Sequence, residues 1–462
     1  MNVVLGRPGD ASITASLLAE AGTEVYYEYG VTPGTYASRT ETAMSVDGAP
    51  VETEITGLAP DTRYFYRLRH RAVGAAEYSA DSERSFHTQR APGATFSFGV
   101  QGDSHPERLG KMYSPELYVR NMNNVADRRP DFYFALGDDF SIERLLEKDL
   151  LTQDNVDQVY LCQRNAFGLV AHSSALFLIN GNHEQAAGYL LGDAYQTPYA
   201  DAPVFAGNAR VRYFPLPGQD AFYTADTEEV EGVGLLRDYY AWTWGDALFV
   251  TIDPYWHSPV PTDTGVPGVA KEEDRWKTTM GDAQYEWLKT TLEGSDAAYK
   301  FVFAHHVLGS GRGAAGLVHS YEWGGYDESG AVYEFPIKRP TWDAPVHRLL
   351  VDNNVTIFFS AHDHLFAREQ VDGVIYQSVP NPADDTYTAF NSDAYDPETI
   401  RLPGAVYDPK FGAILPNAGF LEVTVSPANV TVAYVRAVLP GDEAAAGAAN
   451  GEVSFSYSVA AD

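Results

Sequence analysis

The chain has 462 residues, of which 45% are hydrophobic and 13% aromatic, a composition that excludes an intrinsically disordered protein. This length exceeds what one hydrophobic core usually serves, so we expect two or three domains. The formal net charge of −31, from 63 acidic against 32 basic residues, repels nucleic acid and anionic lipid, and we expect neither a nucleic acid nor a membrane as a stable partner.

Residues 1–90 consist of short segments of alternating apolar and polar character with turn residues between them, which predicts a small antiparallel β-sandwich. The segments are ASITASLL, TEVYYEYG, PVETEITGL, TRYFYRLRHR and ERSFHTQ. The stretch GLAPDTRYFYRLR, with Tyr64 and Tyr66, resembles a fibronectin type III module, in which such a tyrosine stabilises the corner between sheets. We expect this domain to be a spacer or docking module, followed by the linker TQRAPGA at 88–94.

From residue 95 to 462 the pattern changes to nearly continuous apolar strands alternating with helical stretches, which predicts buried sheets in an α/β or layered sandwich domain. The expected strands are TFSFGVQGD, DFYFALGDD, ALFLINGNHE, ALFVTID, YKFVFAHH, VTIFFSAHDH and GVIYQSVPN, and the expected helices are 115–127, 154–170, 282–294 and 343–352. From about 418, GFLEVTVSPANVTVAYVRAVL and GEVSFSYSV predict a β extension packed on this domain, with a flexible loop, PGDEAAAGAANG, between them.

Five of the predicted strands end in residues that commonly bind metals. They are GDSH with Asp103 and His105, GDD with Asp138, GNHE with Asn182 and His183, AHH with His305 and His306, and AHDH with His362 and His364. Ligands in α/β folds gather where the carboxyl ends of strands meet loops. In extended backbone, residues two apart point to the same side, so the last two histidines can converge on one point. The sequence therefore predicts a metal site at these strand ends.

In this order the five segments resemble the calcineurin-like metallophosphoesterase family, over roughly residues 95–380, and the leading β domain is similar to that of purple acid phosphatases and PhoD-type alkaline phosphatases. The resemblance implies an α/β fold, a layered α/β/β/α sandwich, with two metal ions. Purple acid phosphatases have a tyrosine three residues after the second-segment aspartate, whereas this chain has Ser141, and His105 stands where they lack a histidine. We therefore expect no tyrosinate-to-iron colour.

The resemblance also implies which residue holds which ion. Carried over segment by segment, it assigns Asp103, His105 and His364 to the first metal, Asn182, His305 and His362 to the second, and Asp138 to the bridge between them. Two divalent ions bring about +4 and two carboxylates remove about 2, so a bridging hydroxide would still leave positive charge for a phosphate. Zinc, iron and manganese all suit these ligands.

Structural roles are also open to residues in and near these segments. Taken singly, Asp103 could be a helix N-cap and His305 a buried, hydrogen-bonded imidazole. We expect His306, Glu184 and Asp139 to orient ligands or backbone rather than to bind metal. We expect His172 to be structural. We expect His257 to pack among the side chains of an aromatic loop.

The loop GSGRGAAG at 309–316 contains Arg312, which could reach a phosphate oxygen, although a solvent-exposed turn is the favoured interpretation. The residues that follow, His319, Tyr321 and Trp323, could form a wall of the pocket or could only pack against other side chains.

The first functional hypothesis is a binuclear metal-dependent phosphoesterase that hydrolyses phosphomonoesters or phosphodiesters, with a small phosphate ester as its partner. By resemblance, the bridging hydroxide attacks without a covalent enzyme intermediate, Asp138 is catalytic, and His183 contacts the phosphate or assists proton transfer. Arg312 is added as a third candidate catalytic residue because of its place in the loop at 309–316. Neither a Gly-x-Ser-x-Gly elbow nor a Walker loop competes with this hypothesis. The alternative is a non-catalytic, metal-stabilised surface or adhesion protein of the same fold, for which we would expect a ligand to be missing.

The cellular location is inferred from weaker features. No run of 18 consecutive apolar residues occurs, and the start, MNVVLGRPGD, lacks the basic and apolar regions of a signal peptide. One cysteine, Cys162, excludes an intrachain disulfide. Because similar families with an accessory β domain are secreted, we expect a periplasmic or secreted protein whose leader is not present in this chain.

Overall fold

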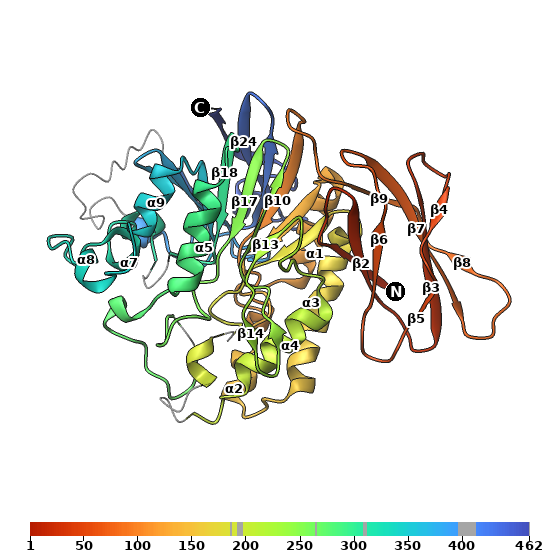
Figure 1. The fold of residues 1–462 in the computed structure, drawn as a ribbon, viewed down its shortest axis with the longest axis horizontal. Helices are drawn as coiled ribbons and strands as arrows, with labels where there is room; N and C mark the ends of the chain where they lie inside the picture. Colours follow the sequence, from red (N-terminus) through yellow and green to blue (C-terminus); the bar gives the residue numbers. More distant parts are fainter. Residues whose placement is uncertain (185–186, 192–196, 264–265, 308–311, 396–412, 462) are drawn as a thin grey trace.

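The computed structural model describes residues 1–184, 187–191, 197–263, 266–307, 312–395 and 413–461. Residues 1–90 form two antiparallel sheets, which lie at one end of the molecule, drawn in red in Figure 1. One sheet contains β1 (Asn2–Gly6), β2 (Ser12–Leu18) and β6 (Val51–Thr56). The other contains β3 (Thr23–Gly30), β7 (Arg63–Ala72) and β9 (Arg84–His87), with the short strands β4 (Ser38–Arg39), β5 (Ala43–Met44) and β8 (Ser79–Ala80).

The corner tyrosine of this β-sandwich makes the contact that its position suggests. The hydroxyl of Tyr64 accepts a hydrogen bond of 2.8 Å from the backbone N–H of Ala59, five residues earlier. The neighbouring Tyr66 instead connects the β-sandwich to the rest of the chain, because its hydroxyl donates to the carbonyl of His172 at 2.6 Å. The two tyrosines thus stabilise different junctions.

Two larger sheets form the centre of the molecule. The first has the order β12 (Ala175–Leu178), β11 (Phe132–Ala135), β10 (Phe96–Gln101), β23 (Gly419–Val425), β24 (Asn429–Arg436), β25 (Val453–Ala460). The second has the order β13 (Thr224–Ala225), β16 (Tyr240–Trp244), β17 (Ala247–Thr251), β18 (Tyr299–Phe303), β19 (Ile357–Ser360), β21 (Val374–Ser378), β20 (Phe366–Val371), β22 (Ala413–Leu415). The expected C-terminal β extension is therefore part of the first sheet, since β23 pairs antiparallel with β10.

The two sheets pack face to face through aromatic side chains. The ring of Phe134 in β11 stacks on that of Phe303 in β18, with 4.1 Å between centroids. Along β18, Phe301 and Phe303 belong to this inner core, whereas Val302 points to the opposite face and packs with helix residues such as Leu288. This alternation follows from the two-residue period of a strand and makes both faces of the sheet hydrophobic.

Helices cover the two outer faces, so the domain is a four-layered α/β/β/α sandwich, as the sequence predicted. On the first sheet lie α1 (Pro115–Arg128), α3 (Gln153–Ala171) and α4 (Ala202–Tyr213), and on the second α5 (Asp282–Glu293) and α9 (Val346–Asp352). Shorter helices are α2 (Glu143–Glu147), α6 (Ala314–Leu317), α7 (Tyr321–Gly324), α8 (Phe335–Lys338) and α10 (Glu443–Ala446). The last of these lies within PGDEAAAGAANG, so the expected flexible loop contains a helical turn.

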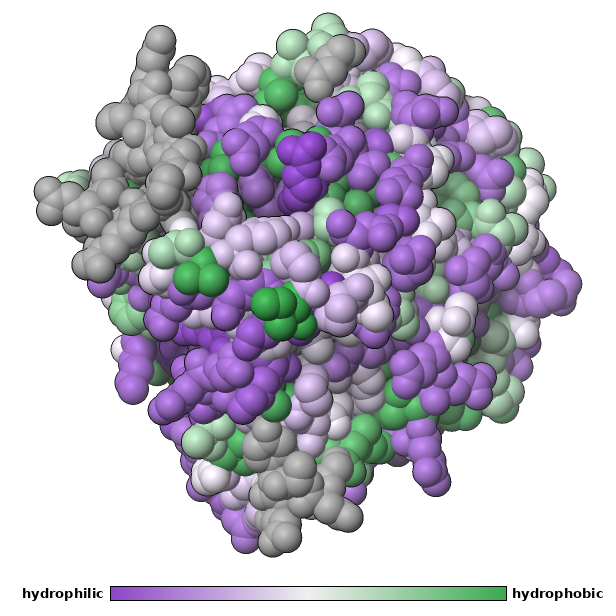
Figure 2. Space-filling model, turned by 60° about the vertical axis from the view of Figure 1, so that its left-hand side comes forward, coloured by the Kyte–Doolittle hydropathy of each residue, from purple (hydrophilic) through white to green (hydrophobic). Residues whose placement is uncertain are grey.

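The surface visible in Figure 2 is mainly hydrophilic, as expected for a chain rich in acidic residues. Figure 2 shows one face of the molecule, on which hydrophilic side chains cover most of the area and hydrophobic ones are scattered in small groups. None of the helices in the described ranges combines the length and the apolar composition that a membrane crossing requires.

Candidate metal centre

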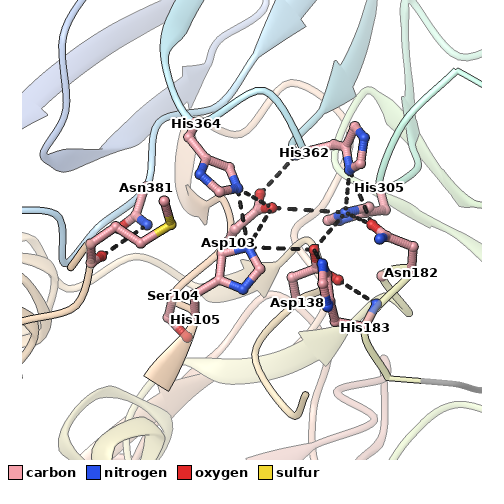
Figure 3. A network of polar contacts seen from close by, with 12 residues as sticks. Asp103, Ser104, His105, Asp138, Asn182, His183, His305, His362, His364 and Asn381 are labelled. Atoms are coloured by element: carbon pink, nitrogen blue, oxygen red, sulfur yellow. Dashed lines mark hydrogen bonds and ion pairs between the residues drawn. The ribbon is translucent and has the colours of Figure 1, made fainter. Parts of the chain in front are cut away.

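The structure brings the seven predicted metal ligands together where the carboxyl ends of β10, β11 and β12 of the first sheet meet those of β18 and β19 of the second (Figure 3). Every one of them is at least 95% buried. In Figure 3 the carboxylates of Asp103 and Asp138 lie at the centre, with imidazoles around them. The seven residues are Asp103, His105, Asp138, Asn182, His305, His362 and His364.

Three of the side chains form a first group with Asp138. His105 Nε2 lies 3.5 Å from Asp103 Oδ2 and 3.5 Å from Asp138 Oδ2. His364 Nε2 lies 2.9 Å from Asp103 Oδ2 and 3.1 Å from His105 Nε2. The donor atoms of this group are close enough to one another to hold one ion among them.

The other three side chains form a second group around the same carboxylate. His305 Nε2 lies 3.3 Å from Asp138 Oδ2 and 3.1 Å from Asn182 Oδ1. His362 Nδ1 lies 3.0 Å from Asn182 Oδ1 and 3.3 Å from His305 Nε2. Asp138 Oδ2 therefore lies within 3.5 Å of both groups, and Asp103 Oδ2, at 3.8 Å from His305 Nε2, also approaches the second group.

The outward-facing nitrogens of three histidines are engaged by acceptors. His105 Nδ1 lies 2.8 Å from Glu107 Oε1, His305 Nδ1 lies 2.7 Å from the carbonyl oxygen of Leu136, and His362 Nε2 lies 3.1 Å from Asp263 Oδ2. An acceptor on one ring nitrogen favours the proton there and leaves a lone pair on the other. With these three rings neutral, their inward-facing nitrogens are acceptors like the carboxylate oxygens beside them, and such a set repels itself unless metal ions or protons lie between its members. The residues present therefore fit metal ions.

The pKa values of the metal-free centre reflect the same excess of negative charge. Burial alone would lower the pKa of His105 and His305, but Asp103 and Asp138, together with Glu107 at the first ring and Glu184 at the second, outweigh burial and raise both pKa values to about 10. In turn, burial would raise the pKa of Asp103 and Asp138, but the adjacent histidines hold both well below the usual range. Without metal ions, protons supply the positive charge that these carboxylates attract.

The backbone around Asp138 is fixed by a buried carboxylate that binds only protein groups. Glu184 accepts hydrogen bonds from the backbone N–H groups of Asp138, Asp139, Phe140 and Gly181, at 2.7 to 3.0 Å. Asp139 accepts from Ser104 Oγ at 2.6 Å and from Gln101 Nε2 at 2.9 Å. Both acids are therefore placed to orient these loops.

Four of the seven side chains leave a backbone in the left-handed region. The φ values are 50° at His105, 57° at Asp138, 67° at His362 and 55° at His364. Non-glycine residues in this region cost on the order of 1–3 kcal/mol each and persist only where the surroundings enforce them. Such conformations cluster at functional sites, because the strand must turn sharply for its side chain to enter the site.

His183 lies beside the two groups, and its ring is close enough to His105 and Asp138 to form a third set of neighbouring donors. Its Nε2 is 3.9 Å from Asp138 Oδ2 and 3.1 Å from Arg108 Nη2, and its Nδ1 is 2.6 Å from Glu143 Oε2. Burial alone would lower the pKa of His183, but Asp138 and Glu143 outweigh it and raise the pKa. The side chain is 13% exposed, so this imidazole can meet a ligand from solvent.

The structure separates the remaining candidates. Arg312 lies next to the centre, because its guanidinium donates to the carbonyl of His362 and lies 3.5 Å from Asp363. Its side chain is 34% exposed, so it is accessible from solvent. His306 stacks on His362 and contacts the hydroxyl of Tyr255, so it supports a proposed ligand instead of joining the donor set.

Three aromatic candidates do not reach the centre. Trp323 is buried in the outer core between the second sheet and its helices, and Tyr321 packs against Trp276 there. His319 lies against His347 on the same side. The interpretation of these residues as packing is therefore the one that the structure supports. His172 ends α3, where its Nδ1 contacts Ser173, and is structural as expected.

Sequence reasoning missed four residues that contact the site. Glu107, Arg108, Glu143 and Asp263 are charged residues in loops or short helices, where no periodic pattern marks them. The one available signal was the short distance along the chain from His105 to Glu107 and Arg108, since GDSHPER places all three within four residues.

Comparison with known proteins supports this fold. No family model and no curated protein matches the sequence. Among solved structures, PhoD is similar over 100% of this chain and 90% of its own, with a TM-score of 0.66 and 15% identity. Purple acid phosphatase PPD1 from yellow lupin (Lupinus luteus) seeds is similar over 99% of this chain and 74% of its own, with a TM-score of 0.60 and 15% identity. The chain therefore has the calcineurin-like phosphoesterase fold.

Proposed function

We propose that this protein is a binuclear metal-dependent phosphoesterase that hydrolyses small phosphomonoesters or phosphodiesters. The observation that carries the proposal is the pair of inward-facing donor groups that both approach Asp138 Oδ2 within 3.5 Å. Of the two structural neighbours, which share this fold, the purple acid phosphatase is a phosphatase by name, which supports the same reaction class.

In this proposal each donor group would hold one ion, and Asp138 would contribute to both. The first group is Asp103, His105 and His364, and the second is Asn182, His305 and His362. Mixed nitrogen and oxygen ligands suit zinc, iron or manganese, so the ligands alone leave the choice of metal open. When bound, two such ions polarise the phosphoryl oxygens and lower the pKa of a water molecule, so that hydrolysis needs no covalent enzyme intermediate.

The protein side chains around the ions bind and orient the ester. His183, held by Glu143 through Nδ1, presents Nε2 near Asp138 and would donate a proton to the leaving-group oxygen. Arg108 and Arg312 lie on either flank, beside His183 and His362 respectively, where guanidinium groups can pair with phosphate oxygens. Neither arginine is fully buried, so both can reach a ligand.

The test is turnover of 4-nitrophenyl phosphate and bis(4-nitrophenyl) phosphate by protein that has been stripped with chelator and reloaded with zinc, manganese or iron. We expect hydrolysis of at least one ester only after reloading, and a loss of roughly a hundredfold or more in Asp138→Asn. Asp127→Asn, an exposed change of the same chemistry on α1, is the matched control and should retain the wild-type rate.

Equal rates in wild type, chelated protein and Asp138→Asn would overturn the proposal and favour the non-catalytic alternative. The ratio of the two ester rates distinguishes a monoesterase from a diesterase, which the shared metal ligands do not.

A further inference from the structure

A second cluster of metal-type side chains lies at the outer edge of the eight-stranded sheet. Asp226 directly follows β13, Asp238 precedes β16, and His257 lies in the loop after β17. Because Ala225 in β13 pairs with Tyr240 in β16, the two aspartates come from neighbouring strands. Asp226 Oδ2, Asp238 Oδ2 and His257 Nε2 are each buried and without a hydrogen-bond partner.

The three side chains converge on one place. One ligand atom from each residue lies within 4.8 Å of the others, and His257 Nε2 is 3.8 Å from Asp238 Oδ2. Asp226 is 3% exposed and Asp238 is 1% exposed, so water cannot readily solvate their unpaired oxygens. Two carboxylates buried side by side repel each other unless a proton or a cation lies between them.

The other oxygen of each carboxylate is already held by protein donors. Asp226 Oδ1 accepts from the Tyr239 hydroxyl at 3.0 Å and from the Glu228 N–H at 2.9 Å. Asp238 Oδ1 accepts from the Tyr239 N–H at 3.0 Å. Metal-binding carboxylates are typically oriented in this way, with one oxygen hydrogen-bonded and the other free for the ion.

We propose that Asp226, Asp238 and His257 bind one divalent transition-metal ion, of the zinc or manganese type. This site is separate from the paired centre, by which we mean the two donor groups around Asp138. Calcium and magnesium prefer oxygen ligands, whereas a set with one imidazole nitrogen suits zinc or manganese. Three protein ligands leave at least one position for water, and the 12% exposure of His257 gives access to solvent. One ion would neutralise both carboxylates.

This ion would connect the edge of the sheet to the loop that supports the paired centre. Asp253, four residues before His257, accepts hydrogen bonds from the N–H groups of Tyr255 and Trp256 and from the Asn180 side chain, at 2.6 to 3.1 Å. Tyr255 in turn contacts His306, which stacks on His362. The role of this site would therefore be structural, since its three ligands lie outside the two donor groups around Asp138.

The experiment counts zinc per chain after chelator stripping and dialysis against Zn²⁺, by inductively coupled plasma mass spectrometry. We expect Asp238→Asn to bind one zinc fewer than wild type, and the double variant Asp138→Asn/Asp238→Asn to bind one fewer than Asp138→Asn. The second comparison separates this site from the paired centre, so it stays informative even if the proposed phosphoesterase function fails. Glu231→Gln, an exposed change in the same segment, is the control and should bind as wild type.

A second readout guards against a misfolded variant. Zinc should raise the melting temperature of Asp138→Asn, and this rise should shrink when His257→Gln or Asp226→Asn is added. An unchanged zinc count and an unchanged melting response in these variants would overturn the proposal, and the two carboxylates would then share a proton instead.

Discussion

At the scale of single residues, Gly181 packs so closely on the proposed bridging ligand that a side chain has no room. A Cβ atom at this position would lie 2.2 Å from Asp138 Oδ1 and 2.4 Å from Asp138 N. We therefore expect Gly181→Ala to displace Asp138, to lower metal content and to destabilise the fold by about 1–3 kcal/mol. Metal analysis and thermal unfolding of the purified variant measure both effects.

The control for this substitution is Gly9→Ala, because a Cβ there meets its nearest neighbour at 3.6 Å, an ordinary contact. Wild-type metal content in Gly181→Ala would contradict the close contact between these loops.

The raised pKa values of His105 and His305 predict that metal binding releases protons. Both pKa values are about 10 in the metal-free centre, above the 6.5 of a free histidine, so both rings carry a second proton and a positive charge at pH 7. A metal ligand must give up that proton, so binding should tighten as the pH rises from 7 toward 10. Calorimetric titration with Zn²⁺ in buffers of different ionisation enthalpy measures the number of protons released.

For this prediction, His172→Gln is the control, because its ring lies outside the centre and should leave proton release unchanged. Binding that is independent of pH, with no proton release, would mean that the two rings are neutral before the metal arrives.

For the residues of the candidate metal centre, the sequence predicted that the proposed ligands meet, but not their tautomers or their backbone conformations. The strand-end positions of Asp103, His305 and His364 were sufficient to predict that they meet, since parallel strands end at one edge. Glu107 and Asp263, which fix the tautomers of ligands, were not predictable, because their position depends on the path of a loop. The left-handed backbone at four ligands was equally outside the pattern.

At the scale of elements, the stability of α3 depends in part on the side chain of its N-cap residue, Thr152. The Thr152 hydroxyl accepts a hydrogen bond of 3.2 Å from the Asn155 N–H and satisfies one of the free donors in the first turn. We expect Thr152→Ala to lower the free energy of unfolding by about 1 kcal/mol with no change in ester hydrolysis. Urea unfolding monitored by circular dichroism tests this, and Thr152→Ser should recover the lost stability.

Elements with a one-sided hydrophobic pattern were predictable, and those without it were not. The helix expected at 115–127 is α1, and the one expected at 282–294 is α5, each within a residue of its limits. The helix expected at 343–352 begins only at Val346, because Pro345 disfavours helical backbone in the residue before it. α4 was missed, since small residues such as Ala206 and Gly207 are buried around it without a clear apolar stripe.

At the scale of the whole molecule, Arg164 joins the N-terminal β-sandwich to the phosphoesterase-fold domain. Its guanidinium is fully buried and donates to the carbonyl oxygens of Ser16, at 2.7 Å, and of Tyr213. Arg164→Leu would leave both carbonyls without this donor, so we expect a loss of about 2–4 kcal/mol in stability. Thermal unfolding measures the loss, and limited proteolysis near residue 90 reports whether the β-sandwich detaches.

Arg348→Leu provides the comparison, because that side chain is 63% exposed and pairs with Asp352 one helical turn away. Its loss should cost about 1 kcal/mol or less. Equal effects of the two substitutions would mean that Arg164 does not connect the two parts.

The pairing of β10 with β23 has a consequence for how the protein is made. β10, whose end carries Asp103, lies between β11 and a strand formed by residues 419–425. A ribosome must synthesise more than three hundred further residues before β10 acquires its second neighbour. During translation the nascent chain therefore exposes one edge of an aromatic strand, a condition that favours aggregation and makes chaperone protection valuable.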